Sequence, residues 1–208
     1  MNDRQRILSR VRAALAPLPA RAPMPVYGDD DGVAREPAHD FAAAVARAGG
    51  RVFVDPSLLV QWLVERRDVR GYCDPSVAPD VRLSLSRGLV LETKLDRRRL
   101  DEYRFGVTRA AGAIAETGTV ILDETTSSSR LAALAPWIHV AVVDADTIRS
   151  RVVDAVGALG GDPYVVWCTG PSKTADVEGI LIQGVHGPGE QVVLLVRRFG
   201  PSAVPPAR

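Results

Sequence analysis

The stretch GAIAETGTVILDETTSSSRLAALAPWIHVAVVD, residues 112–144, contains the pattern that decides the fold. Residues 112–123 are rich in β-forming side chains around a glycine, and residues 127–135 predict a short helix. Residues 138–144 form a near-continuous apolar run, which is typical of a strand in a sheet covered on both faces. The stretch therefore predicts a strand, helix and strand of an α/β domain.

The same alternation extends in both directions along the chain. We expect helices at 38–48, 56–66 and 147–158, the last capped by Asp146, and strands at 51–54, 69–72, 88–92 and 164–168. The runs ILIQGV and QVVLLVRR flank HGPGE, residues 186–190, as the two strands of a hairpin. Together these elements predict a three-layer α/β/α domain with a mostly parallel sheet and some antiparallel edge.

The N-terminal part of the chain has a different composition. Residues 2–15 place Ile7, Leu8, Val11 and Leu15 on one face of a basic amphipathic helix, with Asn2 or Asp3 as its cap. Five prolines and an acidic cluster at 29–31 follow between positions 17 and 37 and predict a linker or extended arm. We expect a helical arm at 1–36, one domain at 37–200 and a frayed tail at 201–208.

The composition excludes several classes of function. Lys and Arg total 26 against 25 Asp and Glu, so the weak net charge gives no reason to expect binding to nucleic acid. The two cysteines, Cys73 and Cys168, are too few and too far apart for a disulfide framework, a zinc site or an iron–sulfur cluster. Because the chain shows neither a signal-type apolar region nor a run long enough to span a membrane, we expect a cytoplasmic protein.

Three segments follow predicted strands, where ligands bind in open α/β sheets. In the first, Glu116, Thr117, Gly118 and Thr119 combine a carboxylate and two hydroxyls with a glycine that allows close approach of the backbone. The structural alternative is a bulge or sharp turn with a solvated glutamate.

The second segment is the run of hydroxyls at 125–129 with Arg130 after it. Hydroxyls at the start of a helix, together with a guanidinium, are suited to holding a phosphate or a carboxylate. Hydroxyl side chains also cap helices for purely structural reasons, so both interpretations stay open.

The third segment runs from Gly170 to Gly179, with about one helical turn expected between Thr174 and Gly179. Ser172, Lys173 and Thr174 offer donors to an anion, and Asp176 and Glu178 offer acid or base groups beside it. The two carboxylates could equally well complement the positive end of that turn. The segment lacks GxxxxGK[ST] and is not a P-loop.

The three histidines show no metal-ligand spacing, and we expect no metal site. His186 lies in the Gly-rich tip, where an imidazole could act as a general acid or base but is more often structural. His139 lies within an apolar strand and is expected to be a hydrogen-bonded core residue, whereas His39 stands at a helix start.

Taken together, these motifs resemble the lactate-utilisation protein C family, whose core is the LUD domain. The resemblance covers roughly residues 40–198 and rests on GAIAETGTVIL, Arg130 with Leu131, IHVAVV, GPSKTADVEGILIQGVHGP and the final strand. It departs from the family at ETTSSS, residues 124–129, where members often have a Gly-rich segment. The resemblance implies a fold like that of the NagB/RpiA/CoA-transferase-like superfamily and membership in a three-component bacterial system that oxidises L-lactate, whose other subunits carry the iron–sulfur cysteines.

Three functional hypotheses remain open at this point. The leading one is a non-redox subunit without a cofactor of its own that binds iron–sulfur partner subunits and a small anion such as lactate, pyruvate or a phosphate or CoA compound. Its ligand-binding residues would be Thr117, Gly118, Thr119, Arg130, Gly170, Ser172, Lys173 and Thr174. The alternative is a stand-alone isomerase or CoA-transferase-like enzyme that acts on a sugar phosphate or acyl-CoA, with catalytic candidates Glu116, Asp176, Glu178 and His186. The third is a scaffold that docks through the basic N-terminal helix.

Overall fold

The computed structural model describes residues 2–16, 37–124, 126–158, 164–175 and 180–197. The chain divides into two compact units, residues 1–32 and 33–208. In the first unit, α1 (Asp3–Leu15) begins at Asn2 with a reciprocal capping box. The Asn2 side chain accepts the Gln5 N–H at 2.9 Å, and the Gln5 side chain accepts the Asn2 N–H at 3.1 Å. The predicted helix and its cap are thus confirmed.

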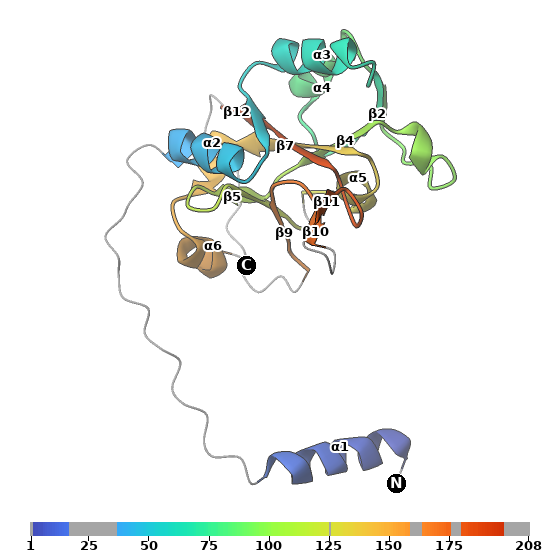
Figure 1. The fold of residues 1–208 in the computed structure, drawn as a ribbon, viewed down its shortest axis with the longest axis vertical. Helices are drawn as coiled ribbons and strands as arrows, with labels where there is room; N and C mark the ends of the chain where they lie inside the picture. The colour runs from blue at the N-terminus through green and yellow to red at the C-terminus, as the bar shows by residue number, and fades with distance from the viewer. Residues whose placement is uncertain (1, 17–36, 125, 159–163, 176–179, 198–208) are drawn as a thin grey trace. The chain divides into compact units, whose positions relative to one another are not determined.

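The second unit is built on a central sheet of six strands in which every neighbouring pair is parallel (Figure 1). The strands lie in the order β1 (Arg51–Phe53), β12 (Glu190–Val196), β7 (Ile138–Asp144), β4 (Phe105–Arg109), β2 (Arg70–Cys73) and β3 (Val90–Glu92). After β2 the chain moves outward to β3, and after β4 it moves in the opposite direction. The carboxyl ends of β2 and β4 therefore form the topological switch point of the sheet.

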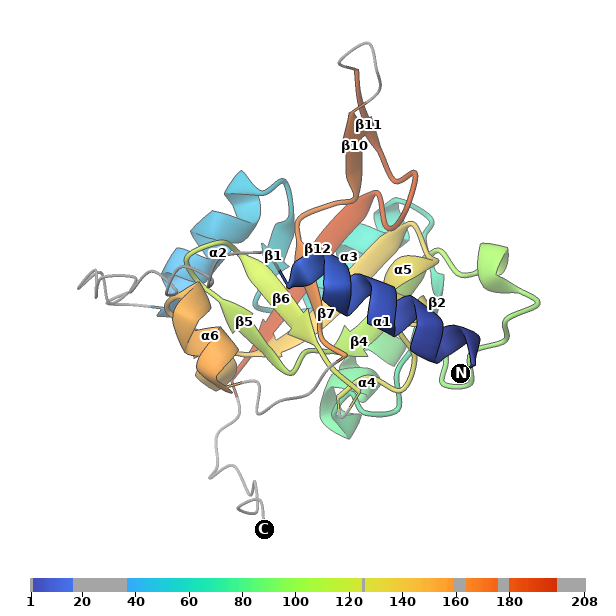
Figure 2. The same ribbon diagram turned by 90° about the horizontal axis from the view of Figure 1, so that it is seen from below.

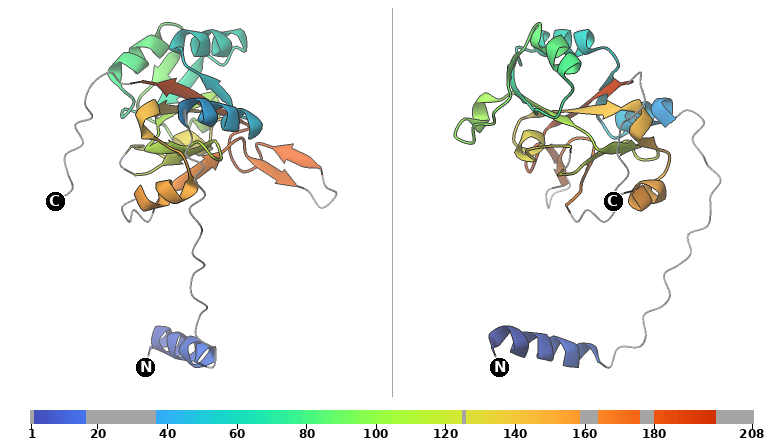
Figure 3. Two further views of the ribbon diagram at one scale, coloured as in Figure 1. Left: turned by 90° about the vertical axis from the view of Figure 1, so that its left-hand side faces the viewer. Right: turned by 180° about the vertical axis from the view of Figure 1, so that it is seen from behind.

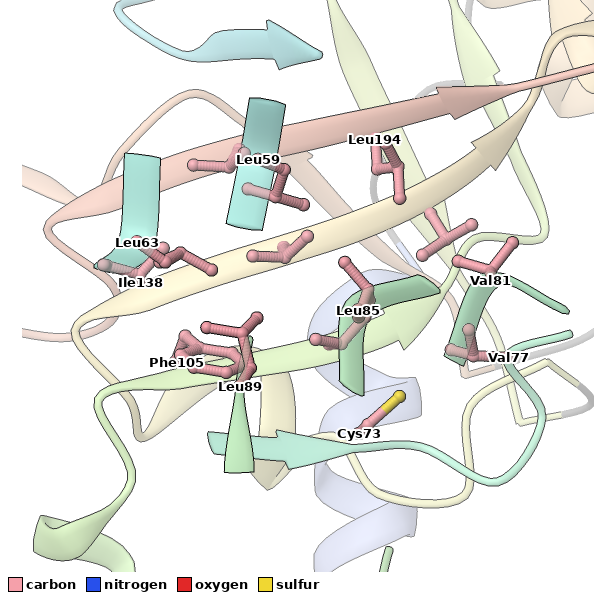
Figure 4. Packing of buried hydrophobic residues seen from close by; sticks show 14 residues of the cluster. Leu59, Leu63, Cys73, Val77, Val81, Leu85, Leu89, Phe105, Ile138 and Leu194 are labelled. Carbon is pink, nitrogen blue, oxygen red and sulfur yellow. The ribbon is translucent and has the colours of Figure 1, made fainter. Parts of the chain in front are cut away.

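Two helices cover one face of this sheet. They are α3 (Pro56–Glu65), which begins after the capping residue Asp55, and α4 (Pro79–Ser86). Figure 4 shows their buried side chains, including Leu59, Leu63 and Leu85, packed against Phe105, Ile138 and Leu194 of the central strands. Burial of aliphatic and aromatic side chains of this kind contributes roughly 1.5–3 kcal/mol each to folding.

The other face is covered by α2 (Pro37–Arg47), α5 (Leu131–Leu134) and a second, four-stranded sheet. The second sheet has the order β8 (Ile148–Arg149), β5 (Gly112–Ile114), β6 (Thr119–Leu122) and β9 (Val166–Thr169). Phe41 and Val45 of α2 share a buried cluster with residues of both sheets. On the outer face of the second sheet, α6 (Val152–Ala158) buries Ala155 with Ile114 and Ile121.

The remaining elements are two short 3-10 helices, η1 (Leu100–Glu102) and η2 (Ala145–Thr147), and an antiparallel pair, β10 (Lys173–Ala175) and β11 (Leu181–Gln183). Figures 2 and 3 show that β10 and β11 project from the body of the second unit. Exposed apolar side chains on β11 include Leu181 and Ile182.

The predicted α/β class and mostly parallel sheet are confirmed, and β7 has the predicted bounds. Three local predictions were wrong. The predicted α-helix at 147–158 begins only at Val152, because Thr147 ends the 3-10 helix η2 and Ile148–Arg149 pairs with β5. The Gly-rich tip at 186–190 does not close a hairpin, because β11 pairs with β10 whereas β12 lies between β1 and β7. Thr174 and Ala175 belong to a strand and do not begin a helical turn.

Candidate functional site

On the second sheet, the predicted segment at 116–119 lies beside Thr169, the residue directly before the predicted segment at 170–179. Thr169 itself was not among the predicted site residues. β6 and β9 are antiparallel neighbours, and Thr119 stands directly opposite Thr169. The Thr119 hydroxyl lies 2.6 Å from the hydroxyl of Thr117 and 2.7 Å from that of Thr169. We call these three residues the threonine cluster. Thr119 is buried, whereas Thr117 and Thr169 are exposed, so the chain of hydroxyls has two solvent-facing ends.

Gly118 fixes the turn that presents the cluster. Its φ of +68° lies in the left-handed region that side chains rarely adopt, and a Cβ there would stand 2.4 Å from the backbone nitrogen of Val45. Only glycine lets the turn between β5 and β6 rest directly on α2. This explains the glycine at 118 in structural terms and locates the turn against the helix.

Glu116, the candidate nucleophile or base, performs a structural task in this geometry. Its exposed carboxylate accepts the N–H of Val152, the first residue of α6, at 2.9 Å, and its own N–H donates to Ser150 O at 3.0 Å. A carboxylate at the start of a helix satisfies a free N–H and complements the helix dipole. Glu116 therefore connects the turn to α6.

The segment that begins at Gly170 passes along the end of α2. A Cβ at Gly170 would stand 2.3 Å from Ala48 O, and the same carbonyl accepts a hydrogen bond from Lys173 Nζ at 3.0 Å. The Lys173 ammonium is therefore held close to the residue that follows Thr169. Because an ammonium carries three N–H groups, two donors of Lys173 remain beyond this bond.

Ser172 ties this segment to the loop before β12. Its N–H donates to Pro188 O at 2.9 Å, and its carbonyl accepts the N–H of Gly184 at 2.9 Å. Thr174 lies in β10, and Asp176 and Glu178 fall outside the described residues. Of the third segment, the structure thus places Gly170, Ser172 and Lys173 beside the threonine cluster or the loop that follows β11.

Arg130 lies toward the other end of β6. It donates to Glu124 at 2.8 Å and to Tyr164 O at 3.1 Å, and its guanidinium lies 5.5 Å from the centre of the Tyr164 ring. Glu124 and Tyr164 flank the pair formed by Leu122 and Val166, three positions from Thr119 along β6. Three residues of strand correspond to about 10 Å, so Arg130 belongs to a separate group of side chains.

The hydroxyl run near Arg130 binds carboxylates of the chain itself. Asp74, fully buried at the end of β2, accepts the N–H of Ser128 at 2.8 Å, the Ser128 hydroxyl at 2.6 Å and the N–H of Ser76 at 2.9 Å. Asp123 likewise accepts the N–H and hydroxyl of Thr126 at 2.8 and 2.7 Å. Two hydroxyl groups of the run expected to bind a ligand, those of Thr126 and Ser128, are therefore engaged by carboxylates of the chain.

Asp74 was not predicted as a site residue, although Asp-Pro-Ser after an apolar strand is a recognisable turn signal. Burial by itself raises the pKa of this carboxyl group, but hydrogen bonds from Ser128 and Ser76 outweigh that effect and lower the pKa below its usual value. Asp74 is thus held as a carboxylate that fastens the loop at 126–129 over the sheet.

The two histidines of interest differ in environment. His186 is exposed in the loop between β11 and β12, where Gly184 and Gly189 approach the Trp137 ring so closely that a Cβ would stand 2.4 and 2.2 Å from it. His139 is completely buried and hydrogen-bonded to Thr108 at 2.8 Å and to Gln191 at 3.0 Å. Burial lowers the pKa of His139 to about 4. The prediction of a hydrogen-bonded core histidine is confirmed.

Within the described ranges, no group of three or more His, Cys, Asp or Glu side chains is placed to hold a metal ion. A search of the same residues finds no helix with the length and apolar character needed to cross a membrane. What the geometry does offer is a cluster of three threonine hydroxyl groups on the second sheet, with the Lys173 ammonium group on the segment that follows β9, bonded to Ala48 O.

These features define an α/β protein with a central parallel sheet and a small hydroxyl-lined site on a second sheet. Residues 83–196 match the model of the LUD domain, and the chain belongs to the LUD domain family. A crystal structure of a DUF162 family protein from Deinococcus radiodurans has a similar fold, with a TM-score of 0.59 and 25% sequence identity over 77% of this chain and 96% of that one.

The curated relatives include proteins named lactate utilization protein C. The one from Deinococcus radiodurans is 33% identical over 168 residues, which is 76% of this chain and 70% of the relative. The one from Bacillus licheniformis is 33% identical over 107 residues, and the one from Bacillus subtilis is 30% identical over 110 residues. This chain spans 45% of the length of each Bacillus protein.

Proposed function

We propose that this chain is a cytoplasmic, non-redox subunit of a bacterial system for the oxidation of L-lactate. In this role it binds a small carboxylate, lactate or pyruvate, at the threonine cluster and associates with iron–sulfur subunits that carry the redox centres. The names of its relatives support the pathway. The two cysteines support the division of labour, because they are too few to hold an iron–sulfur cluster.

The observation that carries the proposal is the bond between Thr119 and Thr169, because Thr169 directly precedes the predicted segment that begins at Gly170. Three hydroxyls carry three protons, and two of these are used within the cluster. The third proton is free to be donated from one exposed end, at Thr117 or Thr169, to a carboxylate. Lys173 adds a positive charge and the remaining N–H donors close by.

The 2-hydroxyl group of lactate and the 2-oxo group of pyruvate fit the same cluster in different ways. A hydroxyl group can both accept a hydrogen bond from the end of the cluster and donate one to it, whereas a carbonyl group can only accept a hydrogen bond. Because a row of hydroxyl groups can reverse the direction of its hydrogen bonds, the cluster is able to accommodate either compound.

Isothermal titration calorimetry on the full chain tests this proposal, with L-lactate and pyruvate as ligands and the uncharged lactamide as control. Thr169→Val and Lys173→Met are expected to weaken binding by about tenfold, the effect of losing one charge-assisted hydrogen bond. Thr93→Val serves as a matched control, because Thr93 is exposed at the end of β3 and outside the cluster. If the wild type and both variants bound lactate with equal affinity, the proposed binding site would be wrong.

A further inference from the structure

The N-terminal helix presents an apolar stripe, which we define as Ile7, Leu8, Val11 and Leu15. These side chains are 60%, 38%, 47% and 55% exposed, and no residue of α1 is buried. An isolated helix of about this length is marginally stable in water, and a capping box adds only about 1 kcal/mol. The stripe gives the helix packing energy only when another surface covers it.

Charge is distributed around the stripe in a definite pattern. At roughly 100° per residue, Arg10 and Arg12 border the stripe on opposite sides and Arg4 lies at its N-terminal end. Arg6 points to the far side of the helix, where it pairs with Asp3 at 2.7 Å. Within the part of the chain that the structure describes, the three arginines at the stripe form no ion pair.

We infer that the stripe docks into an apolar groove bordered by Asp and Glu side chains on a partner subunit. The apolar residues require a groove that excludes water, and the bordering guanidinium groups require carboxylates. A second copy of α1 fits poorly, since like charges would meet along the border. The stripe has no aromatic residue, which makes a lipid surface a poor match as well.

The choice of partner rests on the proposed function, which supplies the iron–sulfur subunits as the proteins to be tested. The experiment measures binding of the full chain to the purified iron–sulfur subunits encoded in the same genome, by biolayer interferometry. Leu8→Asp places a carboxylate in the stripe and is expected to weaken binding by at least about tenfold. Ser9→Asp makes the same addition on another side of the helix and is expected to change binding by less than about twofold.

A second pair of variants tests the charged border. Arg10→Gln is expected to weaken binding about threefold and to reduce its dependence on salt, because one screened attraction is lost. Arg6→Gln removes the same charge from the far side and should change neither quantity. Amide exchange of α1 should also slow on binding, since a marginal helix becomes packed.

Four outcomes would overturn the inference. The first is binding of the subunits with equal affinity by Leu8→Asp and Ser9→Asp, or no binding by the wild type. The second is a lower thermal unfolding temperature of the isolated chain in Leu8→Asp, which would show that its own domain covers the stripe. The third is a dimer in light scattering that Leu8→Asp dissociates, and the fourth is stripe-dependent binding to phosphatidylglycerol vesicles. Lactate binding by the isolated Leu8→Asp variant is expected to match the wild type, so failure here is separable from failure of the ligand site.

Discussion

Thr119 and Thr169 stand opposite each other on β6 and β9 and share a hydrogen bond of 2.7 Å across 50 positions of sequence. The bond has energetic as well as functional consequences. We expect Thr119→Val to lower the free energy of unfolding by about 1 kcal/mol, the net value of a buried hydrogen bond. Thr117→Val should lower the free energy of unfolding less, because Thr117 is an exposed residue and water can replace its hydroxyl as a partner of Thr119. Urea denaturation measures both values, and equal costs would contradict the buried role of Thr119.

Gly118 offers a sharper test of how the site is held. Gly118→Ala combines a left-handed backbone with a Cβ 2.4 Å from the nitrogen of Val45, and we expect a loss of about 2–4 kcal/mol. Gly157→Ala is the matched control. A Cβ at Gly157 in α6 would meet no atom within 4 Å beyond its chain neighbours and the backbone of its own helix, so alanine there should stabilise the protein by about 0.5–1 kcal/mol. Similar changes in the free energy of unfolding for Gly118→Ala and Gly157→Ala would show that the turn does not rest on α2.

His139 predicts a pH dependence of stability in the mildly acidic range. Burial lowers the pKa of this imidazole from 6.5 to about 4. The folded state therefore binds fewer protons than the unfolded state between these values, and stability falls as the pH decreases from about 6.5 toward 4. The total effect is about 3 kcal/mol. Urea denaturation at pH 7 and pH 4.5 should show the decline in the wild type and a much weaker one in His139→Gln.

Asp74 acts in a lower pH window. The pKa of Asp74 is lower in the folded state than in the unfolded state. Its contribution to stability is therefore complete above the unfolded-state pKa of about 4 and is lost as the pH falls through the folded-state pKa. We expect Asp74→Asn to cost about 2–3 kcal/mol at pH 7, because the amide cannot accept all the hydrogen bonds from Ser128 and Ser76. The gap between variant and wild type should narrow below pH 4. Asp80→Asn, exposed in the first turn of α4, is the control and should cost about 0.3–1 kcal/mol.

Much of the fold follows from local sequence, and the errors have identifiable physical causes. The apolar run at 138–144 predicts β7 to the residue, because a strand buried on both faces leaves a continuous signal. Residues 79–86 and 105–109 went unrecognised as helix and strand. The first is a short helix with alternating polar residues, and the second contains Gly106, whose position faces the carbonyl of Ala132. Both elements form because of tertiary contacts that their local sequence does not reveal.

Only part of the candidate site could be predicted from the sequence. The turn at 116–119 and the segment at 170–179 were predicted to meet. The pairing of β6 with β9 brings the turn beside Thr169, the residue before that segment, whereas Asp176 and Glu178 lie outside the described residues. The antiparallel pairing of β6 with β9 places Arg130 away from this turn. Its position depends on the direction and register of the two strands, and local sequence patterns do not reveal either. The bond from Asp74 to Ser128 spans 54 positions, and no local pattern indicates that these two residues meet.

The position of β12 affects how this protein is made. This strand is translated after every other strand of the central sheet, yet it lies between β1 and β7 and joins them. A nascent chain on the ribosome therefore has β1 without its neighbour and β7 with one edge open until the last strand emerges. Closure of the sheet must await the synthesis of β12, and until then the exposed edges are a target for chaperones and for misassociation.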